Sequence, residues 1–170
     1  FRHWGECEIM FIHLNTHSVY SPMRGLLSLS DLMNLSQSHG MDTLALTDVN
    51  GMWGFIRFVQ HCKDAGISPI AGTNLITEND DVILLAENQY GYENMCRAVS
   101  AVHDNSKQSI TDILEKQLAG LFVLSHKEST LNKLINIIPY THLFLELRPG
   151  IQEIYMQKLS KKLKLEMVVT

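Results

Sequence analysis

Short hydrophobic runs and longer amphipathic stretches alternate along almost the whole chain. Each hydrophobic run is only a few residues long, which is typical of a strand with both faces buried in a sheet. The stretches between them repeat hydrophobic residues at helical spacing. We therefore expect seven strands, near residues 10–14, 43–47, 68–72, 82–86, 121–125, 142–147 and 165–170.

Two of the amphipathic stretches carry clear signals for helix ends. Ser30 is the expected N-cap of a helix that runs to His39 and stops at Gly40. A second helix is expected over residues 54–65, because hydrophobic residues recur on one face and Gly66 follows. Further helices are expected near residues 92–102, 110–118, 129–138 and 151–163.

This order of elements predicts an α/β fold. Strands that alternate with helices pair in parallel through right-handed crossovers. One exception is expected at residues 74–86, where a polar turn at 78–81 joins two hydrophobic runs and predicts a hairpin. The pattern does not distinguish a doubly wound sheet from a barrel.

The two ends of the chain bear on the domain limits. Met10 directly precedes the first strongly hydrophobic run, so residues 1–9 are interpreted as an N-terminal extension. Residues 166–170 are interpreted as a strand without a closing helix. We therefore expect one domain over residues 10–170, incomplete at its C-terminal end.

Composition excludes several classes of protein. A hydrophobic content of 45% over 170 residues predicts a globular domain with one sizeable core. The net charge of -4 argues against a domain that binds nucleic acid by itself. Three widely spaced cysteines indicate neither a disulfide framework nor a zinc knuckle. The sequence shows no membrane span or signal peptide, so a cytoplasmic protein is expected.

Candidate chemistry lies at the ends of the first two predicted strands. His13, Asn15 and His17 alternate along an extended chain, so all three can face one pocket. Asp48 follows the second strand. Imidazole and carboxylate groups at neighbouring strand ends suit a divalent metal. Taken alone the pattern favours a simpler interpretation, in which Asp48 caps a loop and the histidines form buried hydrogen bonds.

The order of these segments resembles that of the polymerase and histidinol phosphatase (PHP) domain. The first segments of that domain are matched by residues 11–21, 44–48, 51–54 and 65–72. The later segments are similar specifically to the PHP domain of bacterial replicative polymerase catalytic subunits, at residues 84–86, 91–97, 120–125, 144–147 and 168–170. This resemblance implies a distorted seven-stranded parallel β/α barrel.

The resemblance also implies a metal site that has been largely lost. Active family members bind divalent metals with His, Asp and Glu side chains at the strand ends. His17 and Asp48 keep such side chains, and His13 is a substitute from the same strand. The other ligand positions of the family carry residues that bind metals poorly, namely Asn15, Arg24, Val49 and Asn74.

Arg24 leads to a specific hypothesis about this lost site. A guanidinium group stays protonated and would repel a metal ion, so we expect Arg24 to fill the space and pair with Asp48. Two further histidines are candidates for the same pocket. His103 follows a helix, and His126 follows a strand at the correct end of the sheet.

The resemblance implies the PHP domain of a replicative or error-prone DNA polymerase catalytic subunit. It would act in DNA replication as a structural and docking module, with no catalytic residue and no cofactor of its own. Its expected partners are the remaining domains of the polymerase chain and a proofreading exonuclease, with DNA bound through the parent polymerase. The alternative is an active phosphoesterase or 3'-5' exonuclease that uses Mn or Zn.

Overall fold

The computed structural model describes residues 11–104, 108–148, 150 and 153–170. Its helices are α1 (Leu29–Ser38), α2 (Phe55–Ala65), α3 (Gln89–Asp104), α4 (Ile110–Leu114), α5 (Glu128–Leu134) and α6 (Glu153–Leu163). Its strands are β1 (Thr43–Leu46), β2 (Ser68–Ile76), β3 (Asp81–Ala86), β4 (Leu121–Ser125), β5 (Leu143–Leu147) and β6 (Met167–Val169). No helix within the described ranges is long and apolar enough to cross a membrane.

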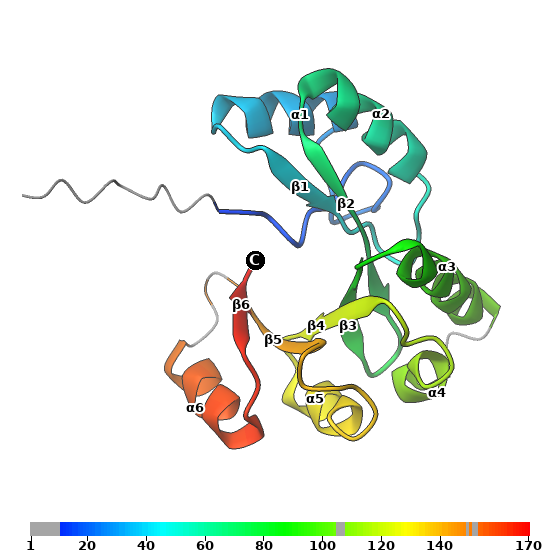
Figure 1. Cartoon of the computed structure of the whole chain (residues 1–170), viewed down its shortest axis with the longest axis vertical. Helices are drawn as coiled ribbons and strands as arrows, with labels where there is room; N and C mark the ends of the chain where they lie inside the picture. Colours follow the sequence, from blue (N-terminus) through cyan, green and yellow to red (C-terminus); the bar gives the residue numbers. More distant parts are fainter. Residues whose placement is uncertain (1–10, 105–107, 149, 151–152) are drawn as a thin grey trace, which may run out of the picture.

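The strands form one sheet in which their spatial order is their order along the chain. The sheet curls like half of a barrel, and the helices lie around its outer side (Figure 1). β3 runs antiparallel to both β2 and β4, whereas the other neighbouring pairs are parallel. The α/β fold and the hairpin are confirmed. The sheet is nevertheless mixed, because the hairpin reverses the direction of β3.

The first expected strand does not form in the described part of residues 10–14. The segment lies beside β1 through hydrogen bonds from Ala45 N to His13 O at 3.1 Å and from Thr47 N to Thr16 O at 2.8 Å. These two bonds do not make a continuous strand ladder, so the prediction is wrong for residues 11–14. Residues 1–10, with the expected N-terminal extension, lie outside the described residues.

The helix ends agree with the sequence signals in part. α1 begins earlier than expected, because Ser28 and not Ser30 is its N-cap and accepts a hydrogen bond from the backbone N–H of Asp31 at 3.1 Å. α2 ends as expected at Gly66, which adopts a left-handed conformation with a φ of 71°.

Three groups of hydrophobic side chains stabilise this arrangement. One fills the space between the sheet and α3 to α6, and a second packs β1 against α1 and α2. The third lies on the inner face of the curled sheet and contains Ile83, Leu85 and Leu124, with Phe144 packed against it. Because side chains alternate along a strand, a polar residue two positions away from one of these lies on the same inner face. Asp81 and Glu146 have this spacing from Ile83 and Phe144.

Candidate functional site

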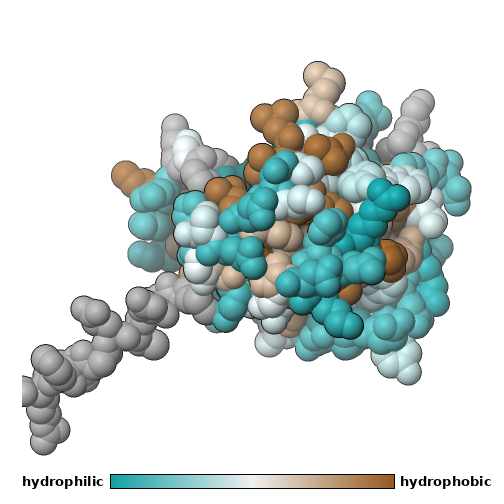
Figure 2. Space-filling view, turned by 90° about the horizontal axis from the view of Figure 1, so that it is seen from above, coloured by the Kyte–Doolittle hydropathy of each residue, from teal (hydrophilic) through white to brown (hydrophobic). Residues whose placement is uncertain are grey.

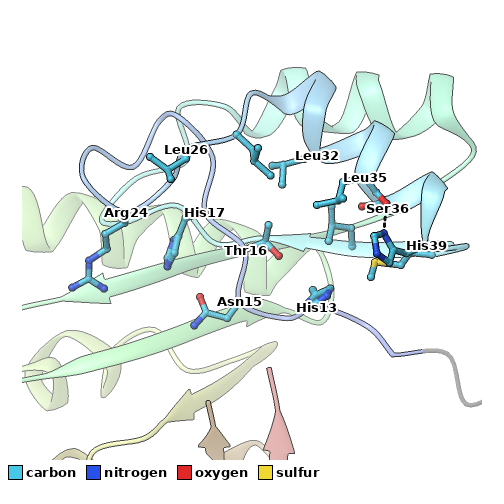
Figure 3. Close-up of a pocket in the computed structure, with 13 residues that line it drawn as sticks. His13, Asn15, Thr16, His17, Arg24, Leu26, Leu32, Leu35, Ser36 and His39 are labelled. Carbon is cyan, nitrogen blue, oxygen red and sulfur yellow. Dashed lines mark hydrogen bonds between the residues drawn. The ribbon is translucent and has the colours of Figure 1, made fainter. Parts of the chain in front are cut away.

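Four of the expected site residues line one open cavity between α1 and the segment at residues 13–27 that precedes it (Figure 3). The cavity has a volume of about 440 Å³, and leucine side chains from α1 and the loop before it form much of the opposite wall. The expected residues that line it are His13, Asn15, His17 and Arg24. The expected residues outside its lining are Asp48, Val49, Asn74, His103 and His126. The structure therefore places four of the expected site residues at this cavity and the other five outside its lining.

Asp48 is buried, and its carboxylate accepts three hydrogen bonds from the turn at residues 18–25. The backbone N–H and the hydroxyl of Ser18 both donate at 2.8 Å, and the hydroxyl of Ser21 donates at 2.6 Å. The turn closes tightly at Gly25, where a Cβ atom would lie 1.8 Å from the carbonyl oxygen of Ser18. Asp48 is thus satisfied by neutral donors.

Arg24 is exposed and lines the same cavity as His17. No ion pair joins Arg24 to Asp48, although both residues lie in the described part of the chain. The expected pairing is therefore wrong. Its physical reason is that the serine donors of the adjacent turn already occupy the oxygens of Asp48.

His17 is an expected ligand with a free ring nitrogen. Its Nδ1 is buried and has no hydrogen-bond partner among the described residues. Burial lowers the pKa of the imidazole, while the nearby charge of Asp48 raises it in part. A neutral imidazole with an open lone pair can bind a metal, but one such group is not a metal site.

A second polar group, which we call the Glu146 cluster, lies at the carboxyl end of β5. Glu146 is fully buried, and its Oε1 accepts hydrogen bonds from the side chains of Asn15 at 2.8 Å and Thr170 at 2.9 Å. Nε of Arg148 lies 2.8 Å from the same oxygen, and Nδ1 of His126 lies 3.4 Å from Oε2. Residues from distant parts of the chain therefore meet at one carboxylate.

The Glu146 cluster extends to β3 through Arg148. Nη2 of Arg148 lies 3.8 Å from Oδ1 of Asp81. The amide of Asn74 donates to the same oxygen at 2.7 Å and to the carbonyl oxygen of Val82 at 3.0 Å. Asn74 thus serves as a hydrogen-bond donor at a position where the resemblance implied a metal ligand.

Glu146 stays ionised in this environment. Burial raises the pKa of its carboxyl group, because the charged form loses its hydration. The contacts with His126, Arg148 and Thr170 outweigh that effect and bring the pKa from 4.5 down to about 2. The carboxylate is therefore charged at neutral pH, and Arg148 is its positive partner.

The two additional candidate histidines have different surroundings. His103 is exposed on α3, where its Nε2 lies 2.6 Å from the carbonyl oxygen of Asn50 and its ring meets the edge of Trp53. His126 approaches Glu146 as described above. Val49 has no side-chain atom that can bind a metal, and it forms a backbone bridge to Asn74.

The sequence interpretation missed Asp81, Glu146 and Arg148 for physical reasons. The sequence pattern predicts site residues after the carboxyl ends of strands, whereas Asp81 begins a strand. The reversal of β3 pairs Asp81 with Ile76 at the end of β2, which brings it to the same edge of the sheet. For Glu146 and Arg148 the available signal was their two-residue spacing, which places both side chains on one face.

Residues 13–164 match the family described as the PHP domain. The chain belongs to this family. Solved structures with the same fold include a two-domain protein from Bacteroides vulgatus that contains a predicted PHP-like metal-dependent phosphoesterase. That structure has a TM-score of 0.64 and 13% identity, and the match covers 92% of this chain and 49% of that one. An amidohydrolase from Chromobacterium violaceum has a TM-score of 0.56 and 12% identity, over 93% and 87% of the two chains.

Curated relatives of this PHP domain are bacterial DNA polymerases. The error-prone DNA polymerase of Symbiobacterium thermophilum is 42% identical over 94 residues, which are 55% of this chain and 9% of that protein. The DNA polymerase III subunit alpha of Bacillus subtilis is 35% identical over 104 residues, which are 57% and 9% of the two chains. The PHP domain thus spans about a tenth of the length of these relatives.

The residues of this PHP domain do not fit the metal cluster that the family implies. No group of three or more His, Cys, Asp or Glu side chains in the described ranges is arranged to hold a metal ion. The oxygens of Asp48 are occupied by serine donors, and the amides of Asn15 and Asn74 point their N–H groups at carboxylates. The arrangement suits an internal network of charges and hydrogen bonds.

Proposed function

We propose that this PHP domain belongs to a bacterial replicative or error-prone DNA polymerase catalytic subunit, where it is a structural and docking module. It has no metal-dependent hydrolysis of its own. The similarity to DNA polymerase III alpha subunits supports the polymerase context. The observation that supports the non-hydrolytic role is the Glu146 cluster, in which the Arg148 guanidinium lies within ion-pair distance of the carboxylates of Glu146 and Asp81.

The partners in this proposal are the remaining domains of the polymerase chain and a proofreading exonuclease, in the cytoplasm. DNA is bound by the parent polymerase and not by this domain alone. The full domain is proposed to close as a seven-stranded barrel. Exposed hydrophobic side chains support docking, such as Leu26 at 90% and Ile56 at 72% exposed. On the face of the molecule that carries α1 and α2, hydrophobic residues are exposed among hydrophilic ones (Figure 2).

A metal titration tests the non-hydrolytic role. The purified chain is incubated with Mn²⁺ or Zn²⁺, dialysed, and assayed for bound metal by mass spectrometry. Hydrolysis of a phosphate monoester and of the 3' end of single-stranded DNA is measured in parallel. We expect less than one bound metal per chain, no turnover above the buffer rate, and a melting temperature unchanged by EDTA, because the donors do not form a cluster.

Stoichiometric metal binding with turnover would support the alternative, an active phosphoesterase or 3'-5' exonuclease. In that case His17→Ala and Asp48→Ala should abolish turnover. The matched control is His61→Ala, which removes a histidine of α2 that does not line the cavity. Turnover that survives in both site variants would point to a contaminating nuclease.

The docking role is tested by calorimetric titration of the chain with the proofreading exonuclease of the same organism. Saturable binding that Leu26→Ser and Ile56→Ser weaken is expected, because both side chains are exposed and hydrophobic. Absence of binding in the unmodified chain would remove this partner from the proposal.

A further inference from the structure

Two carboxylates approach each other at the inner edge of the sheet, and a guanidinium group lies between them. Arg148 places Nε 2.8 Å from Oε1 of Glu146 and Nη2 3.8 Å from Oδ1 of Asp81. Glu146 is fully buried and Asp81 is nearly so. Neutral donors can compensate one buried carboxylate, but two carboxylates at one buried site also repel each other, and a positive group between them offsets that repulsion.

The neutral residues around these carboxylates are oriented as donors. Asn15 and Asn74 direct their amide N–H groups at Glu146 and Asp81, at 2.8 Å and 2.7 Å. A metal ligand must offer a lone pair, whereas an N–H group repels a cation. At these two positions, therefore, the amide N–H groups complement anionic side chains.

Arg148 also joins separate elements of the fold. Arg148 follows β5, Asp81 begins β3, and Asn15 lies in the segment before α1. Metal ions commonly join side chains from several strands at such a position. A guanidinium group is suited to the same task, because it is planar, permanently charged and able to contact two carboxylates at once.

We propose that Arg148 is the built-in cation of this PHP domain, holding Glu146 and Asp81 together where a metal ion would otherwise be required. This inference rests on the proposed non-hydrolytic role and deepens it. It assigns the cation to Arg148 and not to Arg24, which is exposed and forms no ion pair with Asp48. Removal of the Arg148 guanidinium leaves a buried anionic gap that accepts a small cation.

The test compares Arg148→Ala with Arg24→Ala, which removes the same charge from an exposed position of the same chain. We expect the melting temperature of Arg148→Ala to fall by roughly 10 °C, because a buried carboxylate loses its partner. Millimolar methylguanidinium, Mn²⁺ or Zn²⁺ should recover more than half of that loss by binding in the gap. Arg24→Ala and the unmodified chain should show no large loss and no recovery.

The assignment of Arg148 can be tested even if the Arg148→Ala chain is unfolded in buffer. Folding on addition of methylguanidinium or a divalent cation, monitored by circular dichroism, supports the built-in cation, and failure with every cation overturns it. Equal melting temperatures for Arg148→Ala and Arg24→Ala also overturn it.

The proposed function and this inference fail in distinguishable ways. Metal-dependent turnover by the unmodified chain removes the non-hydrolytic role. A metal-free, inactive chain whose Arg148→Ala variant gains no cation response leaves that role intact and removes only the assignment to Arg148.

Discussion

A buried carboxylate loses its hydration, and Asp48 and Glu146 regain partners in different ways. Asp48 receives only neutral donors, from Ser18 and Ser21, whereas Glu146 combines neutral donors with a guanidinium group. The sequence identified Asp48 from its place at a strand end but assigned it the wrong partner. The serine hydroxyls come within reach only when the turn at residues 18–25 folds, and sequence spacing does not report that geometry.

Replacement of Asp48 tests how much this turn contributes. Asp48→Asn replaces one of the two carboxylate oxygens with an NH2 group, so at least one of the three donors loses its acceptor, and we expect the free energy of unfolding to fall by about 2 kcal/mol. Urea denaturation gives the value. Asp42→Asn is the control, because Asp42 is exposed and accepts a single hydrogen bond from its neighbour Thr43. Equal losses in the two variants would mean that the turn donors are not the cause.

Individual elements were predictable where a local signal fixes them. Gly66 ends α2 as expected because the left-handed conformation favours glycine. The polar turn forms the expected hairpin, at residues 77–80, because Asp81 already pairs with Ile76. The strand predicted for residues 11–14 does not form, although the hydrophobic residues of this segment are typical of a strand. Only two backbone hydrogen bonds hold the chain from His13 to Thr16 against β1, and such pairing depends on neighbours that are distant in sequence.

Two glycines allow a comparison between local conformation and tight packing. At Gly66 a Cβ atom meets nothing within 4 Å, so Gly66→Ala should cost about 1 kcal/mol, from the positive φ alone. At Gly25 the Cβ atom would collide with the backbone of Ser18, so Gly25→Ala should cost clearly more and displace the donors of Asp48. Urea denaturation ranks the two variants. A Gly25→Ala variant as stable as Gly66→Ala would show that the turn adapts freely.

At the scale of the whole molecule, alternation of strands and helices was enough to predict an α/β fold but not to distinguish a doubly wound sheet from a barrel. The composition of the Glu146 cluster was not predictable in this way. Asn15, Asp81 and Arg148 are far apart in sequence, and they meet only because the sheet curls and β3 is reversed. The resemblance assigned ligand positions to Asn15 and Asn74, but the ion pairs of Arg148 with Glu146 and Asp81 could be identified only in the folded arrangement.

The same cluster makes the stability of the whole chain depend on pH. The pKa of Glu146 is about 2 in the folded chain against an ordinary value of 4.5. A depressed carboxyl pKa stabilises the fold fully above 4.5, and that contribution is lost as the pH falls from 4.5 towards 2. We expect Glu146 to account for about 3 kcal/mol of the loss. Urea denaturation at a series of pH values measures it, with Glu146→Gln flattening this part of the curve. The exposed Glu78→Gln serves as control, and an acid dependence that is the same in both variants would place its origin outside the cluster.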